Sequence, residues 1–585
     1  MSRTALWTTL ALVVGPSLLS RSVSAAAYYN NSQEYQSGAL GASPTQSFRS
    51  VNFSTVALNY NVLPSSFSSS NDSYLFLAPR GTDVSDPTAL ILTPDGEVVW
   101  FGAAEEFGYA QSMAFQTGYY KGQQVITIWD GRFNAAGYGN GFGIILDQSY
   151  SLIANLSSNI EGSTLDFHEF YLTDNDTALA TVYINQQYDL SSYNVTTTDG
   201  SQGWILGGAF EEIEVATGQS LFTWKSLDHV EPSQCYAEPG STGTDTTNPY
   251  DYFHINSIEK DLQGNYLISS RHCHALYYIS AQTGAILWTI GGKNSSFSMG
   301  DGSAFEWQHD ARWRDNYTQI SVFDNAATSW ESDESYARGL LLNVDTSANS
   351  VTLAQAFIPW NQTVSKSQGS MQQLSNGNWL LGWGQTPFFS EYDLSGTLLS
   401  SAQFGVGNVQ GYRVLSSNWT GYPTTTPALA VVNNASTSQY DIYVSWNGAT
   451  EVDQWVLTAS SNPSSSSATT TTLNQVQKTT FETLISIDQD VAASYSWVQS
   501  KAVSSNGSIL GFSDWVALNG STASVPADEA QSSQVTVGTA SATSTSQPSS
   551  AVSTSSGGSS AASKEVAAEV ATVLLLVAGG LVALL

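Results

Sequence analysis

The sequence predicts an all-β protein, and its composition is the first reason. Charged residues make up only 11% of the 585-residue chain, whereas aromatic residues reach 12% and Gly, Ser, Thr and Asn are common. This profile is typical of a β-rich protein exported from the cell rather than of a helical cytosolic one. A chain of this length has room for two or three domains.

A repeated outline is the second reason. Five segments share a polar or histidine residue that is followed, about a dozen residues later, by an apolar strand. They start at Gln111-Ser112, His168, His254, His309 and Gly369-Ser370. Repeats of short strands separated by Gly turns predict the blades of a β-propeller, which we place at residues 71–425. An array of β-sandwiches would give a similar pattern, and the irregular spacing does not fix the number of blades.

Residues 1–25 predict a secretory signal peptide. They combine a positive start at Arg3, an apolar stretch and a small-residue cleavage site. Residues 26–70 are then an N-terminal extension ahead of the propeller. Asn-x-Ser/Thr sequons such as the one at Asn52 agree with export and predict N-linked glycans.

The charge balance excludes one class of partner. With 18 basic and 49 acidic residues, the chain has a formal net charge of −31. Nucleic-acid binding needs clustered Lys and Arg, so we expect no nucleic-acid partner. An acidic surface suits solubility in an acidic external medium.

Cys235 and Cys273 are the two cysteines of the chain. In an oxidising compartment the simplest expectation is a disulfide between them. It would close a loop of about 38 residues and stabilise the fold by about 3–4 kcal/mol.

Residues 426–525 predict a second β domain. The segments 440–446, 453–457 and 494–499 alternate as half-buried strands, and 504–508 is a turn before another strand. We expect a small fibronectin- or immunoglobulin-type β-sandwich. No catalytic pattern is visible in it, so a spacer or docking role is expected.

The C-terminus carries a second targeting signal. Residues 526–558 lose the hydrophobic pattern and predict a disordered, O-glycosylated Ser/Thr-rich stalk. Residues 559–585 combine small residues, a spacer and an apolar tail, which predicts a GPI-anchor signal. A tail-anchoring helix is the alternative, but an apolar run of about 16 residues is shorter than the roughly 20 that span a bilayer. We therefore expect an extracellular protein held at the plasma membrane or cell wall by a GPI anchor.

The histidines indicate where the functional site lies. Four of the six, His254, His272, His274 and His309, fall within residues 252–313. A chain this poor in histidine that gathers them in one region is expected to use imidazole chemistry there.

The phase of three histidines sharpens this expectation. His168, His254 and His309 hold the same position in three successive repeats. Equivalent positions of successive propeller blades face one another around the central channel, so the three side chains should meet. A single histidine before a strand is more often a hydrogen-bonded core or turn residue, but three in phase predict a site.

The segment after residue 266 leaves two chemistries open. Strand alternation would put Arg271 and Cys273 on one face and His272 and His274 on the other. The first chemistry holds an anionic group with four basic side chains: His168, His254, His309 and Arg271. The second binds a metal ion through the pair His272 and His274, completed by one of His168, His229 and Asp310.

Four short motifs carry a resemblance to a known family. LDFHEF, YFHINSI, LISSRH and WQHDARW occur in this order and resemble the aryl sulfotransferase family of the ASST type. The resemblance covers roughly residues 70–425 and implies a six-bladed propeller that moves a sulfuryl group between phenols. It implies no cofactor, because that family does not use the nucleotide donor PAPS. The extra His272 and His274, the C-terminal domain and the anchor differ from the bacterial pattern and are closer to a fungal secreted branch.

The resemblance also implies residue roles. In that family a channel histidine attacks the sulfur of an aryl sulfate to give a sulfohistidine, while two histidines and an arginine bind the sulfuryl oxygens. Matched motif by motif, the nucleophile is His309 and the supporting groups are His254, Arg271 and His168. Positive and hydrogen-donating groups would stabilise the charge on the sulfuryl oxygens, and neutral imidazole is a competent nucleophile.

Substrate-binding candidates lie beside these residues: Asn256, Phe253, Trp307 and Arg312. Asn256 shares a face with His254 in an extended segment and could donate a hydrogen bond. The aromatic residues could clamp a planar aryl ring, although most aromatic residues of this chain are expected in the core.

Three functional hypotheses remain from the sequence. The first is a secreted sulfotransferase that takes aryl sulfate and phenol substrates. The second is a metal-dependent oxidoreductase or hydrolase built on the channel histidines, although we assign no metal ligand. The third is a propeller that serves as a non-catalytic binding protein at the cell surface.

Overall fold

The computed structural model describes residues 27–67, 73–104, 111–134, 137–195, 197, 202–464, 469–519 and 524–525. The expected signal peptide, stalk and anchor signal lie outside the described residues. None of the helices in the described ranges is long and apolar enough to cross a membrane.

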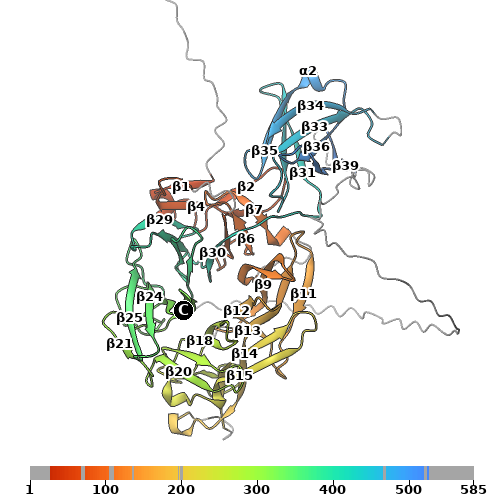
Figure 1. Ribbon diagram of the computed structural model, residues 1–585. Helices are drawn as coiled ribbons and strands as arrows, with labels where there is room; N and C mark the ends of the chain where they lie inside the picture. The colour runs from red at the N-terminus through yellow and green to blue at the C-terminus, as the bar shows by residue number, and fades with distance from the viewer. Residues whose placement is uncertain are drawn as a thin grey trace, which may run out of the picture. The chain divides into compact units, whose positions relative to one another are not determined.

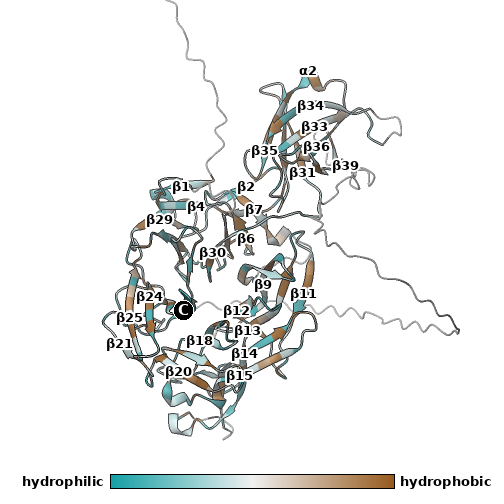
Figure 2. Cartoon of the chain, viewed as in Figure 1, coloured by the Kyte–Doolittle hydropathy of each residue, from teal (hydrophilic) through white to brown (hydrophobic). Residues whose placement is uncertain are grey.

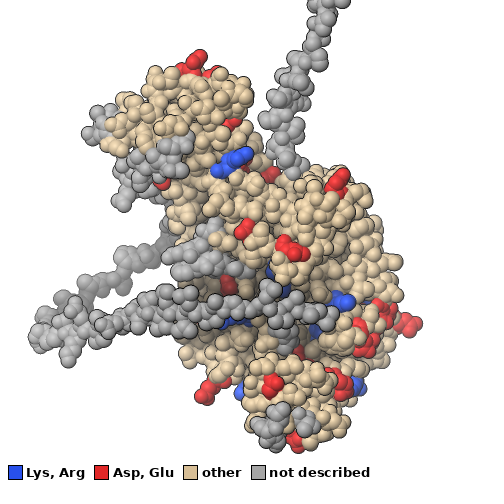
Figure 3. Space-filling model, turned by 180° about the vertical axis from the view of Figure 1, so that it is seen from behind, with Lys and Arg blue, Asp and Glu red and all other residues tan. Residues whose placement is uncertain are grey.

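The regular structure of the described residues is almost wholly β, which confirms the all-β prediction (Figure 1). Two short α-helices, α1 (Gln33–Gln36) and α2 (Gln489–Ala492), accompany the strands. Hydrophobic residues run along the strands, as Figure 2 shows. Acidic side chains are scattered over the face seen in Figure 3.

Consecutive antiparallel strands form one set after another along the chain. The first two sets share a 9-stranded sheet: β8 (Met113–Tyr120), β9 (Gln123–Phe133), β10 (Gly139–Leu146) and β11 (Leu152–Leu156), then β12 (Leu165–Leu172), β13 (Thr177–Tyr188), β14 (Gly203–Glu214) and β15 (Ser220–Lys225), with β16 (Tyr250–Asp251) beside β14. The next sets are β17 (Ile255–Lys260), β18 (Tyr266–Ser270), β19 (Ala275–Ile279) and β20 (Ile286–Gly291), then β22 (His309–Arg314), β23 (Gln319–Asp324), β24 (Arg338–Asp345) and β25 (Ser350–Phe357), with β21 (Ser298–Met299) beside β25. The last is β26 (Ser370–Gln373), β27 (Trp379–Gly382), β28 (Phe388–Tyr392) and β29 (Leu398–Gln403).

Strands from the two ends of this region pair with each other and close it. The late strand β30 (Val414–Asn418) pairs with β5 (Ser73–Leu77), which continues into β6 (Leu90–Leu92) and β7 (Val98–Phe101). The early strand β4 (Leu58–Val62) pairs with β29, and β1 (Tyr28–Asn30) pairs with β4. A hairpin of β2 (Thr45–Ser47) and β3 (Ser54–Val56) lies between β1 and β4 in the chain.

The first strand of each set faces the centre of the fold, and we call these the channel strands: β8, β12, β17, β22, β26 and β30. Each contacts the next, and β30 contacts β8, so they close a circle (Figure 1). This is the arrangement of a β-propeller. The number of blades stays a prediction, because β10 also pairs with β12 at Gly141 and Leu165 and merges two sets.

Several channel strands share an irregularity where they begin. The register shifts after Met113 in β8, after Ile255 in β17 and after His309 in β22. His254 and Asp310 adopt left-handed backbone at φ 53° and 54°. Bulges of this kind re-aim side chains and are frequent beside active sites. Two of these three shifts adjoin His254 and His309, which the repeats single out.

Residues 428–525 form two further sheets around a core of their own. One sheet is β31 (Ala428–Asn434), β32 (Gln439–Ser445) and β35 (Thr483–Asp488); the other is β34 (Thr471–Gln477), β33 (Gln454–Ser460), β36 (Trp497–Val503), β37 (Ile509–Phe512), β38 (Trp515–Ala517) and β39 (Ser524–Val525). Buried Ile442, Trp455, Leu457 and Val498 belong to this core. The boundaries of this domain and its immunoglobulin-type topology stay predictions.

Candidate active site

Three histidines from successive sheets meet at the channel, as their phase in the sequence predicts. His168 lies in β12, His254 directly precedes β17, and His309 begins β22. The ring centroids of His168 and His254 are 4.8 Å apart. Tyr412, which precedes β30, has its ring centroid 5.7 Å from that of His168 and 6.4 Å from that of His309. All three histidines are buried.

Each of these histidines is oriented through its Nδ1 atom by a side-chain oxygen. The pairs are His168 Nδ1 and Asp166 Oδ1 at 2.6 Å, His254 Nδ1 and Asp251 Oδ2 at 2.5 Å, and His309 Nδ1 and Asn325 Oδ1 at 2.6 Å. The bonds leave Nε2 of each ring as the nitrogen that can meet a ligand.

The tautomer of His309 follows from the surroundings of Asn325. Asn325 Nδ2 donates to the backbone oxygens of Ser365 and Gln368, each at 2.9 Å, so its Oδ1 faces His309. His309 must then carry hydrogen on Nδ1 and a lone pair on Nε2. The backbone N–H of Gln368 donates to this Nε2 at 3.2 Å. Burial, with the nearby Arg271 charge, holds the pKa of His309 well below its ordinary value.

Arg271 places a positive charge beside the histidines, and the Asp251 carboxylate acts on it only from beyond ion-pair distance. Its Nη2 donates to Lys366 O at 2.8 Å, and its Nη1 lies 2.9 Å from His272 Nε2. None of the ion pairs in the described part of the chain includes Arg271. Burial lowers the pKa of its guanidinium to about 10, so it remains charged at neutral pH. A buried cation that lies beside imidazoles and forms no close ion pair is suited to an anionic ligand.

The expected strand alternation at residues 271–274 is wrong. These residues form a tight turn between β18 and β19, with His274 at φ 51° and its N–H bonded to Arg271 O at 3.2 Å. A turn has no alternating faces, so Arg271 and His272 lie side by side rather than on opposite faces.

The expected disulfide between Cys235 and Cys273 is present. It fastens this turn to the segment that carries Tyr236. The backbone N–H of Tyr236 donates to His272 O at 2.8 Å, and the Tyr236 ring stacks on His274 at 4.3 Å. The disulfide therefore helps to hold Arg271 in place.

Asp251, His254 and His272 have the composition of a metal site, with donor atoms within 4.8 Å of one another. Both nitrogens of His272 are already engaged, Nδ1 by Asp251 O at 2.7 Å and Nε2 by the Arg271 guanidinium at 2.9 Å. An ion here would displace one of these bonds and lie beside a positive charge. The donors are thus arranged for hydrogen bonding, and the metal-dependent hypothesis gains no support from this geometry.

Trp307 is the substrate-binding candidate that borders the histidine group. Its ring lies 5.8 Å from that of His272, and the Arg271 guanidinium lies 5.3 Å from its centroid. Trp330, which is 64% exposed, contacts Trp307 at 5.8 Å and His272 at 6.3 Å. The two tryptophans form an aromatic path from the surface toward Arg271.

Phe253 and Asn256 have structural surroundings. The Phe253 side chain is wholly buried and stacks on Tyr277 at 5.7 Å, within the core between two sheets. Asn256 is also wholly buried and donates from Nδ2 to Gln308 O at 2.7 Å. We therefore leave both residues out of the site proposed below.

Arg312 is held in a buried ion cluster. Its guanidinium bonds to Glu169 at 2.5 Å and to Asp310 at 2.9 Å. Arg413, which precedes β30, also pairs with Glu169, at 2.8 Å, and donates to His168 O at 3.0 Å. The carboxylates therefore neutralise Arg312, and it is not available to an anionic ligand. The cluster instead braces the channel strands.

The groups that orient the histidines were not identified from the sequence. Asp166 and Asp251 lie two and three residues before their histidines, in LDFH and DYFH, and this spacing was a usable signal. Asn325 follows the second strand of its set and has no such signal. Tyr412 precedes β30, the first strand of a further set. The other strands of that set come from the opposite end of the region, so the sequence shows no repeat after Tyr412.

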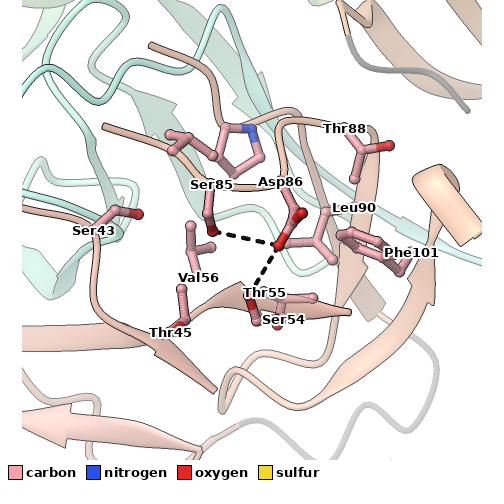
Figure 4. A pocket seen from close by; sticks show the side chains of 12 residues that line it. Ser43, Thr45, Ser54, Thr55, Val56, Ser85, Asp86, Thr88, Leu90 and Phe101 are labelled. Carbon is pink, nitrogen blue, oxygen red and sulfur yellow. Dashed lines mark hydrogen bonds between the residues drawn. The ribbon is translucent and has the colours of Figure 1, made fainter. Parts of the chain in front are cut away.

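A small pocket lies elsewhere, beside the β2–β3 hairpin (Figure 4). Its volume of about 10 Å³ has room for about one water molecule. Ser54 donates to Asp86 Oδ2 at 3.0 Å, and Ser85 does so at 3.4 Å. The pocket includes none of the site histidines.

Comparisons with known proteins identify a family for the central part of the chain. Residues 117–405 match the family model Arylsulfotransferase (ASST). No curated protein matches the chain. A protein of unknown function from Bacteroides caccae is 13% identical, and the match covers 59% of this chain and 98% of that one with a TM-score of 0.33. The β-propeller domain of Cps50 (Swd1) from Myceliophteria thermophila is 9% identical over 58% of this chain and 96% of its own, with a TM-score of 0.27.

Proposed function

Residues 117–405 are an arylsulfotransferase (ASST) family domain, and from this premise we propose that the protein moves a sulfuryl group from an aryl sulfate ester to a phenol through a sulfohistidine at His309. The observation that carries the proposal is the state of His309. Asn325 fixes its hydrogen on Nδ1, and the lone pair of Nε2 would attack once it releases the hydrogen bond from the Gln368 N–H.

The first half-reaction forms the sulfohistidine. The lone pair of His309 Nε2 forms a bond to sulfur, and the bond between sulfur and the aryl oxygen breaks. The electron pair of that bond leaves with the oxygen as phenolate, which then takes a proton from solvent. Covalent catalysis of this kind divides one difficult transfer into two easier steps.

Three side chains bind the sulfuryl oxygens during this step: Arg271, His254 and His168. Arg271 supplies a charge that forms no ion pair within the described residues, and the two histidines supply Nε2 atoms near it. Burial holds the pKa of His254 well below its ordinary value, so donation from its Nε2 requires that the bound anion, together with Asp251, favours the protonated form. Fixed donors around the sulfuryl group stabilise the charge that its oxygens carry.

The second half-reaction restores His309. The oxygen of the acceptor phenol bonds to sulfur, the N–S bond breaks, and its electron pair returns to Nε2 while the phenol loses its proton. The two half-reactions exchange one phenol for another, so no cofactor is consumed. In this proposal Trp307 and Trp330, which contact each other beside Arg271, bind the aryl ring.

We propose that the protein works outside the cell. The signal peptide expected at residues 1–25, the GPI-anchor signal expected at 559–585 and the sequons support this location. The Cys235–Cys273 disulfide is consistent with it, because such bonds persist in oxidising compartments.

Intact-mass measurement tests the proposal. The purified ectodomain is incubated with 4-nitrophenyl sulfate at alkaline pH, where an N–S bond should survive. We expect a gain of one SO3 unit on the peptide that contains His309, and its loss when a phenol is added. His309→Ala should lose both the adduct and turnover.

His229→Ala is the matched control, because His229 stacks on Trp224 at 5.1 Å outside the site. This variant should retain the adduct. A folded wild-type protein that gives neither adduct nor turnover with several aryl sulfates would instead support the cell-surface binding protein.

A further inference from the structure

Tyr412 holds a buried hydroxyl beside the catalytic candidates. Its side chain is 2% exposed, and its ring packs edge-on against those of Phe167, His168 and His309. Tyr412 lies two residues before β30, near the place that His254 holds directly before β17, and its ring lies close to both His168 and His309. It therefore completes the circle of channel-facing residues on the side where no histidine stands.

The hydroxyl of Tyr412 has no hydrogen-bond partner in the described part of the chain. A buried hydroxyl without a partner destabilises a folded protein, since it has lost its bonds to water. Burial also raises the pKa of Tyr412, so the hydroxyl keeps its hydrogen. Arg271 and Arg80 both interact electrostatically with this phenol. The unused donor thus belongs to a ring that lies 6.4 Å from that of His309 and 5.3 Å from the Arg413 guanidinium.

From this geometry we infer that Tyr412 is a further catalytic residue, whose hydroxyl donates a hydrogen bond to an oxygen of the sulfuryl group during transfer. This inference rests on the proposed function and adds a contact to the same site. The hydroxyl donates without losing its proton, so no bond other than those of the two half-reactions forms or breaks.

The choice of oxygen follows from the geometry of attack. In an in-line transfer the leaving oxygen lies opposite the nucleophile, and the other three oxygens lie around the sulfur between them. The Tyr412 ring centroid lies 6.4 Å from that of His309, so we expect its hydroxyl on the nucleophile's side of the sulfur rather than beside the leaving oxygen. It should therefore meet the sulfuryl oxygens and leave the aryl oxygen to solvent and to the tryptophans.

Tyr412→Phe tests the inference, and 4-nitrobenzenesulfonate is the probe. This ligand carries the same sulfonyl oxygens as the substrate but has a C–S bond that is not transferred. By calorimetry we expect Tyr412→Phe to bind it about 10- to 100-fold more weakly than the wild type. Its melting temperature should equal or exceed that of the wild type, because the variant removes an unsatisfied hydroxyl.

Tyr183→Phe is the matched control. Tyr183 is equally buried and contacts His168 and His254, but its hydroxyl is bonded to Ile255 O at 2.8 Å. We expect this variant to melt at a lower temperature and to bind the sulfonate as the wild type does. Opposite effects on stability and binding separate a ligand contact from a structural hydrogen bond.

Values of kcat/KM for several aryl sulfates show which substrate oxygen the Tyr412 hydroxyl contacts. A contact with the sulfuryl oxygens predicts that Tyr412→Phe lowers kcat/KM by a similar factor, about 10- to 100-fold, for aryl sulfates of acidic and of weakly acidic phenols. A loss that grows with the basicity of the leaving phenol would overturn the assignment. So would wild-type affinity for the sulfonate in Tyr412→Phe. If the wild type neither binds the sulfonate nor transfers the sulfuryl group of any aryl sulfate, the proposed function itself fails.

Discussion

Asn325 accepts a hydrogen bond from Nδ1 of His309 at 2.6 Å, whereas the equivalent acceptors for His168 and His254 are carboxylates. A neutral partner fixes the tautomer of His309 without favouring its protonated form, and a carboxylate favours that form. The pattern of partners thus separates one histidine with a neutral partner, the nucleophile, from two histidines whose partners are carboxylates. The distinction predicts different kinetic consequences at the two kinds of position.

Asn325→Ala should reduce kcat. Without the acceptor, His309 can rotate or move its hydrogen to Nε2, and a nucleophile displaced by about 1 Å costs about 100-fold in rate. Steady-state kinetics with 4-nitrophenyl sulfate checks this, alongside circular dichroism to establish folding. Unchanged kcat in a folded variant would show that the Asn325 bond does not position the nucleophile.

Asp251→Asn should act on KM instead. The amide oxygen of the variant can keep the bond to His254 Nδ1. The other carboxylate oxygen, Oδ1, has no hydrogen-bond partner in the described residues, so the amide NH2 that replaces it breaks no bond. What is lost is the charge that supports a protonated His254 beside the bound anion. We expect KM for the sulfate donor to rise about tenfold with kcat less affected. An equal loss of kcat and no change in KM would contradict this role.

The sequence identified the part of the site that repeats, and the reason is physical. A β-propeller places equivalent positions of its sheets around one channel, so His168, His254 and His309 could be grouped from their phase alone. The expectation for Arg271 to His274 failed because alternation applies to extended chain, and these residues turn. Tyr412 precedes a strand that pairs with β5 from the other end of the region, and Asn325 follows the second strand of its set, where no repeated residue marks it.

Trp330→Ala should weaken binding of the aryl group. Trp330 is 64% exposed and contacts Trp307 and His272 at the edge of the site. Losing one aromatic contact should raise KM for aryl sulfates by about 3- to 10-fold while kcat changes little. Trp360→Ala is the control, because Trp360 is 40% exposed and its ring contacts Phe388 instead. Equal effects of the two substitutions would argue against an aromatic path at Trp330.

Glu169→Gln should destabilise the fold. Glu169 is wholly buried and bonds to both Arg312 and Arg413. Removing one partner leaves buried positive charge with less compensation, which typically costs about 3–5 kcal/mol. Chemical denaturation measures the loss in free energy of unfolding. The exposed Glu161 gives the control, since Glu161→Gln should change it by less than about 0.5 kcal/mol. A comparable small loss in Glu169→Gln would show that the cluster does not brace the channel.

His274 should make stability depend on pH. Burial first, then the charges of Arg271 and Lys293, lower the pKa of His274 from 6.5 to about 3. As pH falls below 6.5 the unfolded chain therefore takes up a proton that the native state refuses, and stability is lost until about pH 3. His274→Asn removes this pH-dependent loss of stability, and asparagine tolerates the left-handed backbone at φ 51°. The wild type should lose about 2 kcal/mol of unfolding free energy between pH 7 and pH 5 through His274, and the variant should not have this loss. Denaturation at the two pH values checks this, and a difference between the proteins that is the same at both would mean that His274 is protonated in the native state.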